Sequence, residues 1–267
     1  MLSVDNALVF HSFLTFAASM DKSYAHDHVV PDEHSKKGKK AQVAEMFDTI
    51  APGYDFLNRF LSGGIDIYWR KKALQTLINH QPKVMLDVAT GTGDLAIMAA
   101  RMLKPERITG IDISPKMLSS GRDKIKKRAL DTVISLVDGD SEAIKFNDNT
   151  FDAVTVAFGV RNFERLETGL QEILRVLKPG GKLVVLEFSK PSSPLWKGLY
   201  NGYMRHIAPV FAGLLSRNKK AYIYLNESIQ AFPEGKDFIS IMDKTGFKQT
   251  TCKPLTFGIC SIYTGEK

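Results

Sequence analysis

Residues 86–97 read LDVATGTGDLAI and join a strand pattern, a tight turn and a helix pattern without a break. An apolar run ends at Asp87, a turn follows at Gly91 and Gly93, and helical spacing begins directly afterwards. A glycine-rich turn between a strand and a helix is typical of sites for nucleotide-like ligands in α/β proteins. This stretch therefore predicts both the class of fold and one wall of a binding site.

The rest of the chain alternates in the same way. Strand patterns occupy residues 83–88, 107–112, 132–138, 151–158 and 181–189, and helix patterns occupy residues 93–103, 115–129 and 164–177. This alternation predicts right-handed βαβ units, that is, an α/β fold with a mostly parallel sheet and helices on both faces. A helix at 234–245 and two last strands, at 247–253 and 256–264, predict a terminal antiparallel hairpin.

Composition narrows the class of protein. The 267 residues fit one substantial domain, and 36 basic against 29 acidic residues give a net charge of +7. That excess is compatible with an anionic membrane or ligand, and equally with solubility alone. The two cysteines, Cys252 and Cys260, form no secreted-type framework, which indicates a reducing compartment. No apolar run is long enough to span a bilayer.

The N-terminal residues differ in composition from the rest of the chain. Residues 1–19 contain no Lys or Arg, so they match neither a signal peptide nor a mitochondrial transit peptide. A polar stretch follows Met20, which could itself be the start. We expect residues 1–40 to form a disordered leader and residues 41–267 to form the domain, with a helical flap at 41–80. A bacterial cytoplasmic enzyme is the expectation from this pattern.

The glycine turn is compatible with more than one ligand. No Lys-Ser/Thr follows the glycines, so a phosphate loop is excluded. Gly91, Gly93 and Ala96 match the dinucleotide pattern, and Asp112 ends the second strand where a ribose diol would bind.

The charges beside the turn favour one of these ligands. Asp94 stands at the start of the helix, where a pyrophosphate would bind, and Asp87 approaches the same turn. Two carboxylates would repel a pyrophosphate but suit a cationic amino-acid group, so we favour S-adenosylmethionine over NAD. Asp94 could also serve only as a helix cap. Asp140 and Ser141 follow the third strand and offer a second polar corner for an adenine. No ligand cluster indicates a metal.

Several stretches together resemble a known family. LDVATGTGDLAI and LKPGG resemble class I S-adenosylmethionine-dependent methyltransferases, and FGVRNF (158–163), LEFSKP (186–191) and the spacing around YDFLN (54–58) resemble the ubiquinone/menaquinone biosynthesis C-methyltransferases. The resemblance extends from Val43 to the C-terminus. It implies a Rossmann-like, seven-stranded sheet with an antiparallel last strand, S-adenosylmethionine as methyl donor, and cofactor contacts at Thr92, Asp112, Asp140 and Ser141. Some relatives have Asn and Ala at the last pair, and Ala157 replaces a serine.

The resemblance also implies the reaction. The substrate would be a polyprenyl quinol methylated at a ring carbon, with demethylmenaquinol as the favoured candidate. The methoxylated precursor of ubiquinone and another small lipophilic molecule remain alternatives. Arg161 and Asn162, after the fourth strand, and Tyr54, in the flap, are the candidate catalytic residues. A guanidinium is a poor base, so Arg161 would stabilise a phenolate or organise water, unless it is only an ion-pair partner at the strand end.

A segment rich in aromatic and basic residues, at 191–232, is the candidate cap over the substrate. Its composition suits an apolar tunnel for the substrate and peripheral contact with the inner face of an anionic membrane. It suits an ordinary cap helix equally well. Residues 36–40 form a basic run that is too short to indicate a nucleic-acid partner. A homodimer is possible, but no pattern in the sequence decides the oligomeric state.

Overall fold

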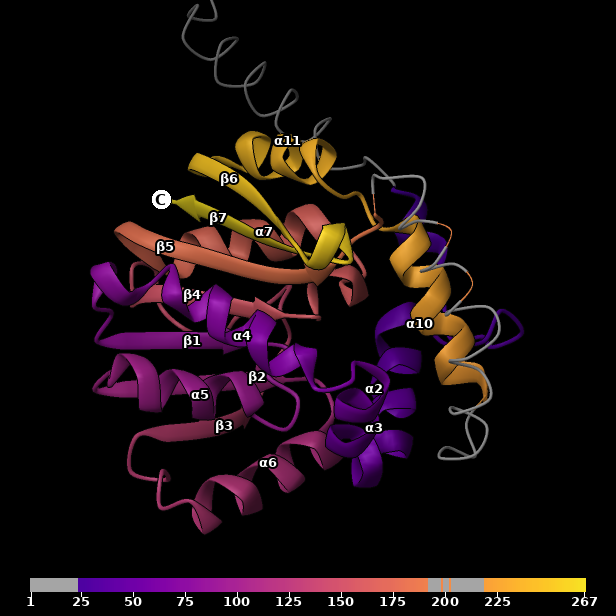
Figure 1. Cartoon of the computed structure of the whole chain (residues 1–267), viewed down its shortest axis with the longest axis horizontal. Helices are drawn as coiled ribbons and strands as arrows, with labels where there is room; N and C mark the ends of the chain where they lie inside the picture. The colour runs from indigo at the N-terminus through magenta and orange to yellow at the C-terminus, as the bar shows by residue number, and fades with distance from the viewer. Residues whose placement is uncertain (1–23, 192–197, 199–201, 203–218) are drawn as a thin grey trace, which may run out of the picture.

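The computed structural model of the chain describes residues 24–191, 198, 202 and 219–267. A seven-stranded sheet with the order β3-β2-β1-β4-β5-β7-β6 forms its centre (Figure 1). Pairs from β3 through β5 are parallel, and β7 is antiparallel to both of its neighbours, which confirms the predicted sheet. The strands are β1 (Val84–Val88), β2 (Arg107–Asp112), β3 (Ile134–Asp138), β4 (Phe151–Ala157), β5 (Leu177–Phe188), β6 (Lys248–Leu255) and β7 (Cys260–Glu266).

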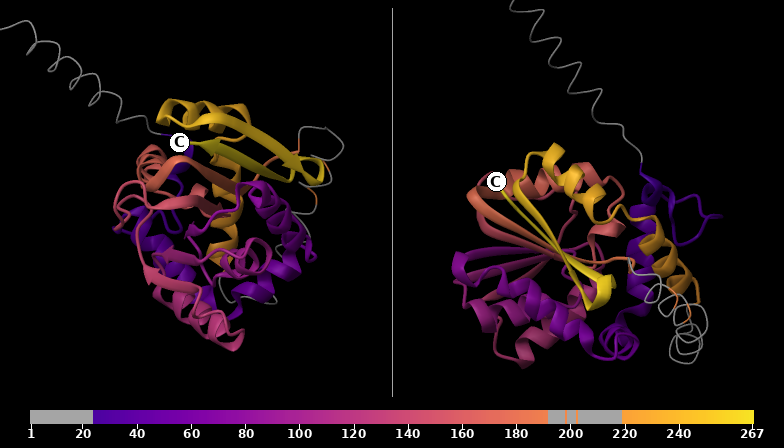
Figure 2. Two further views of the ribbon diagram at one scale, coloured as in Figure 1. Left: turned by 90° about the vertical axis from the view of Figure 1, so that its left-hand side faces the viewer. Right: turned by 45° about the horizontal axis from the view of Figure 1, so that its top comes forward.

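Helices cover both faces of this sheet (Figure 2). On one face, Leu74 and Ile97 pack against strand residues such as Met85. On the other, Leu170 and Phe238 pack around Val154. Fully burying side chains of this kind stabilises a fold by roughly 1.5–3 kcal/mol each. The helices are α2 (Lys39–Ile50), α3 (Tyr54–Leu61), α4 (Ile65–Gln75), α5 (Asp94–Leu103), α6 (Pro115–Lys127), α7 (Leu166–Val176), α10 (Lys219–Ala231) and α11 (Lys236–Thr245), with short 3-10 turns η1 (Ala25–His28), η2 (Ala51–Gly53), η3 (Ile78–His80), η4 (Val160–Asn162) and η6 (Thr256–Gly258).

The turn after β1 has the conformation that its glycines permit. Gly91 has φ +56° and Gly93 has φ +76°, both in the left-handed region that side chains with a Cβ rarely adopt. Helix α5 then begins at Asp94. The turn therefore lies at the carboxyl edge of the sheet, where Figure 1 also places α2, α3 and α10.

The largest differences from the predicted boundaries concern β5 and the terminal hairpin. Strand β5 begins at Leu177 rather than at 181, because Leu177 still pairs with Phe151 and an irregularity in register accommodates the residues that follow. The terminal hairpin turns at η6 rather than at residues 253–255. Pro254 thus lies inside β6, which is tolerated because β6 is an edge strand.

The prediction of a disordered leader is wrong for residues 24–40. His26 is fully buried with its ring 5.9 Å from that of Phe232, the Tyr24 hydroxyl bonds Glu167, and Lys39 Nζ donates to the His26 carbonyl at 2.6 Å. Burial lowers the pKa of His26 to about 3, so its ring stays neutral and packs among apolar groups. Residues 1–23, including Met20, lie outside the described residues.

Candidate active site

A cleft opens at the carboxyl edge of the sheet, with about 650 Å³ of empty space when the open solvent at its mouth is included. Helices α2 and α3 form one wall, and the loops after β1 to β4 form the other, which is where open α/β sheets bind ligands. Six of the predicted site residues line it: Tyr54, Gly91, Asp112, Asp140, Ser141 and Asn162.

Asp112 joins two loops at the floor of this cleft. Its Oδ2 accepts a hydrogen bond from the Gly91 amide at 2.8 Å, and its Oδ1 accepts one from the Ser114 amide at 2.9 Å. Burial raises the pKa of Asp112 to about 6, against these hydrogen bonds, which lower it. A carboxylate has about four lone-pair sites, so beyond its backbone donors Asp112 retains acceptor capacity for a ribose hydroxyl.

Asp140 forms the second polar corner, together with a lysine that the sequence did not indicate. Lys40 of α2 lies 2.6 Å from Asp140 Oδ2 and 3.3 Å from Glu142 Oε2. Asp140 Oδ1 accepts the Glu142 amide at 2.9 Å, and Ser141 lines the same wall. Lys40 stood at the end of the expected leader, far from Asp140 in the chain, so no local pattern joined the two residues.

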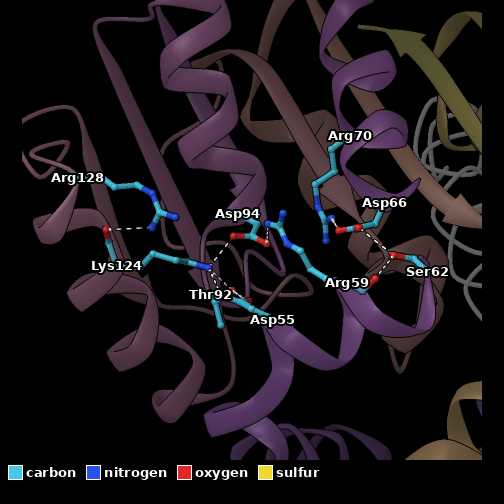
Figure 3. A network of polar contacts seen from close by, with 9 residues as sticks. All are labelled: Asp55, Arg59, Ser62, Asp66, Arg70, Thr92, Asp94, Lys124 and Arg128. Carbon is cyan, nitrogen blue, oxygen red and sulfur yellow. Dashed lines mark hydrogen bonds and ion pairs between the residues drawn. The ribbon is translucent and has the colours of Figure 1, made fainter. Parts of the chain in front are cut away.

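Thr92 and Asp94 are not among the residues that line the cleft. Lys124 Nζ lies 2.5 Å from Asp55 Oδ2, 2.7 Å from Asp94 Oδ1 and 2.8 Å from Thr92 Oγ1 (Figure 3). Thr92 Oγ1 also donates to Asp55 Oδ1 at 2.6 Å, and Arg59 lies 3.2 Å from Asp94. These contacts tie the flap helix α3 to α5 and α6. Asp94 therefore carries a paired charge, not the free one expected beside a cationic ligand.

Asp87 and Gly93 also serve the framework around the turn. Asp87 is 2% exposed and accepts hydrogen bonds from the Thr90 and Thr155 hydroxyls, both at 2.6 Å. Burial raises its pKa to about 6. A Cβ at Gly93 would lie 3.5 Å from Ile125 and 3.6 Å from Leu136, so this glycine faces packed side chains. Neither residue lines the cleft.

Arg161 lies just behind the cleft wall. Its Nη1 lies 2.7 Å from Glu187 Oε1 and also bonds the Phe158 carbonyl, and its side chain is 6% exposed. Its guanidinium carbon is 5.6 Å from the centre of the Phe188 ring. Nε is buried and has no hydrogen-bond partner in the part of the chain that the structure describes. Arg161 therefore has an ion-pair partner, Glu187, which fits the alternative interpretation of Arg161 as a structural residue.

Asn162 and Tyr54 both line the cleft. Asn162 Oδ1 accepts a hydrogen bond from the Tyr224 hydroxyl of α10 at 3.0 Å. The Tyr54 ring packs edge-on against Phe47, with centroids 5.9 Å apart. Burial raises the pKa of Tyr54, so its hydroxyl keeps its proton at neutral pH. Tyr224 and Phe47 were missed because their role depends on the packing of helices that are distant in sequence.

Comparison with known proteins identifies the family. The model of the ubiE/COQ5 methyltransferase family matches residues 35–267. The chain belongs to this family.

Curated ubiE/COQ5-type relatives match along nearly their full length. A demethylmenaquinone methyltransferase of Bacteroides fragilis is 46% identical over 246 residues, which cover 92% of this chain and 100% of the relative. The ubiquinone/menaquinone biosynthesis C-methyltransferase UbiE of Geobacter sulfurreducens is 46% identical over 234 residues, covering 87% and 90%. A demethylmenaquinone methyltransferase of Thermus thermophilus is 43% identical, covering 83% and 100%.

Solved structures agree on the fold of this ubiE/COQ5 enzyme. A SAM-dependent methyltransferase of Thermotoga maritima, described as a possible histamine N-methyltransferase, superposes with a TM-score of 0.54 at 20% identity, covering 84% of this chain and 99% of that one. A SAM-dependent methyltransferase of Aquifex aeolicus gives 0.50 at 17% identity, covering 69% and 81%. The Rossmann-like class I methyltransferase fold is thereby confirmed.

The enzyme is a methyltransferase whose methyl donor is S-adenosylmethionine, and the cleft residues fit that molecule. Asp112 offers acceptors for a ribose, and the open backbone at Gly91 allows close approach. Within the described ranges, no group of three or more His, Cys, Asp or Glu residues could hold a metal ion, and no helix is long and apolar enough to cross a membrane. Most of the expected cap at 191–232, namely 192–197, 199–201 and 203–218, lies outside the described residues.

Proposed function

We propose that this enzyme methylates a ring carbon of demethylmenaquinol and so produces menaquinol. The observation that carries the proposal is the 46% identity to the Bacteroides fragilis demethylmenaquinone methyltransferase, which is matched over its entire length. The cleft supports it, because polar groups for a quinol, Tyr54 and Asn162, line the same cleft as Asp112.

Methylation of a quinol ring carbon requires three contributions from the protein. An aromatic carbon is a weak nucleophile until a neighbouring hydroxyl loses its proton and pushes charge onto the ring. S-adenosylmethionine, when bound, supplies a methyl group on a positively charged sulfur and leaves as the neutral thioether. The chain must therefore orient the ring, exclude competing water, and stabilise negative charge on the quinol oxygen.

Three residues are proposed to meet these needs. Tyr54 and Asn162 would hydrogen-bond the quinol oxygens, since both line the cleft and neither is charged. Arg161 would act through its positive charge from behind the wall, because Glu187 and the Phe158 carbonyl already hold its Nη1. A guanidinium that stays protonated cannot serve as a base, so the quinol proton would pass to water. Bond formation at carbon is then followed by loss of the ring proton.

The ubiquinone precursor is the second candidate, since the Geobacter sulfurreducens relative carries both quinones in its name. The test is methyl-labelled S-adenosylmethionine with demethylmenaquinol in one reaction and the polyprenyl methoxybenzoquinol in another, both kept reduced. Label in the naphthoquinol alone supports the proposal, and label in both rings indicates a dual enzyme. Label in neither, with the cofactor bound, would refute the substrate assignment.

The place of action is a related proposal. A polyprenyl quinol resides in a lipid bilayer, and the net charge of +7 favours an anionic surface. We therefore expect peripheral binding at the inner face of a bacterial cytoplasmic membrane. Co-sedimentation with vesicles of phosphatidylglycerol, compared with phosphatidylcholine alone, tests it: equal binding to both at low and high salt would contradict an electrostatic attachment.

A further inference from the structure

Tyr224 connects helix α10 to the rim of the cleft. This side chain is 1% exposed and packs with Val43 and Met46 of α2. Its hydroxyl lies 3.0 Å from Oδ1 of Asn162, which belongs to the 3-10 turn η4 directly after β4. The phenol therefore connects a helix outside the nucleotide-binding core to a polar group that lines the cleft.

The direction of this hydrogen bond fixes the amide of Asn162. A buried hydroxyl proton needs an acceptor, and the acceptor at hydrogen-bond distance is the amide oxygen. If the amide were turned over, its NH₂ group would donate to the phenol oxygen and the phenol proton would lose its acceptor. Burial raises the pKa of Tyr224, so the proton is present at neutral pH. The amide oxygen of Asn162 is thus held toward Tyr224, and its NH₂ group is directed away from it.

We infer that Tyr224 is a positioning residue that holds the Asn162 NH₂ group as a hydrogen-bond donor to the quinol oxygen on which negative charge develops. This inference rests on the proposed function and adds a residue to it. In the described part of the chain, Nδ2 of Asn162 has no protein acceptor, so its two N–H groups remain available to a ligand in the cleft. A preorganised donor at a developing oxyanion is worth more than one that must first rotate into place.

The first test is Tyr224→Phe, which keeps the packed ring and removes only the hydroxyl. Without the hydroxyl proton of Tyr224, the side-chain amide of Asn162 is free to rotate. Its oxygen could then face the phenolate and repel it. We expect kcat for methyl transfer to demethylmenaquinol to fall about tenfold, with the Kd for S-adenosylmethionine unchanged by calorimetry. Tyr263→Phe is the matched control, since it also removes a buried phenol that is hydrogen-bonded, to the Gly235 amide at 2.8 Å, and Tyr263 does not line the cleft.

A double-mutant cycle separates positioning from general packing. If Tyr224 acts through Asn162, the variant Tyr224→Phe/Asn162→Ala should be no slower than Asn162→Ala alone. Additive losses in the cycle would overturn the inference, and so would a Tyr224→Phe enzyme with unchanged kcat.

A binding measurement tests the same point without turnover. A prenylated 1-naphthol, which has one hydroxyl, is titrated by absorbance in the complex with S-adenosylhomocysteine. A tenfold loss of phenolate stabilisation corresponds to a pKa of the bound naphthol about one unit higher in Tyr224→Phe than in the wild type. Equal pKa values would overturn the inference. Failure of the wild type to methylate the quinol would instead refute the proposed function.

Discussion

Nη1 of Arg161 lies 2.7 Å from Oε1 of Glu187, and both side chains are buried between the ends of β4 and β5. Glu187 also accepts the Arg161 backbone amide at 3.3 Å and the Phe188 amide at 2.9 Å. One carboxylate thus fixes both the guanidinium and the turn that carries Asn162. The pair holds the rim of the cleft in place from behind.

Glu187→Gln should destabilise the protein strongly. Removing one partner of a buried ion pair leaves the other charge uncompensated, at a cost of about 3–5 kcal/mol in the free energy of unfolding. Urea denaturation measures this change. The control is Glu266→Gln in β7, whose pair with Lys182 of β5 is 3.8 Å apart and partly exposed. That variant should change the free energy by less than about 1 kcal/mol. Equal effects of the two variants would contradict a special role for the buried pair.

Lys124→Met should loosen the flap. It removes contacts to Asp55, Asp94 and Thr92, and so unties α3 from α6. The bonds of Asp55 and Arg59 to the start of α5 remain. Hydrogen bonds to charged groups contribute roughly 1.5–3 kcal/mol, so we expect faster proteolytic cleavage in residues 51–64 and about tenfold weaker binding of S-adenosylmethionine. Arg128→Met is the control. Arg128 directly follows the last residue of α6, and its Nη1 donates to the Lys124 carbonyl. Unchanged cleavage in Lys124→Met would show that packing alone holds the flap.

Affinity for S-adenosylmethionine should depend on pH through Asp112. The pKa of this carboxyl is raised to about 6, so it becomes protonated as pH falls through 6 and loses acceptor capacity for the ribose. Binding requires the ionised form, so the Kd should rise as pH falls below about 6, approaching tenfold per pH unit. Calorimetry from roughly pH 5 to roughly pH 8, a range that brackets the titration of Asp112, measures the Kd. Asp112→Asn should bind weakly and without this dependence.

Asp87→Asn is the matched control for that titration. The pKa of Asp87 is also raised to about 6, yet Asp87 bonds Thr90 and Thr155 and does not line the cleft. Its variant should retain the pH dependence of binding. Loss of the dependence in Asp87→Asn, but not in Asp112→Asn, would reverse the assignment.

His26 should make the N-terminal segment sensitive to acid. Its pKa is lowered to about 3 in the folded protein against 6.5 in the unfolded chain, because burial disfavours the charged ring. Between these values the unfolded chain binds a proton that the folded protein does not, so stability is lost as pH falls from about 6.5 toward 3.

The measurement is the difference in free energy of unfolding between the wild type and His26→Leu across that range. Buried carboxylates such as Asp112 act in the opposite direction, but they are present in both proteins and cancel in the difference. The wild type should lose stability relative to His26→Leu as pH falls. A constant difference would mean that His26 is protonated without cost.

Local chemistry explains what the sequence determined on its own. The alternation of strand and helix, the left-handed turn at Gly91 and Gly93, and the position of Asp112 at the end of β2 all follow from short-range periods and backbone preferences. The antiparallel pairing of β6 with β7 followed from two strand patterns too close together for a crossover. The reversal of β7 against β5 was implied by the resemblance to the family. These features placed the cleft at the correct edge of the sheet.

Only the tertiary structure decided which partner each polar side chain bonds. Asp94 pairs with Lys124 and Arg59, Asp140 with Lys40, and Asn162 with Tyr224. A carboxylate or an amide has the same local signature whether it faces a ligand or a distant side chain. Which of these it meets depends on how segments far apart in the chain pack together, and only the folded structure brings those segments within hydrogen-bond distance.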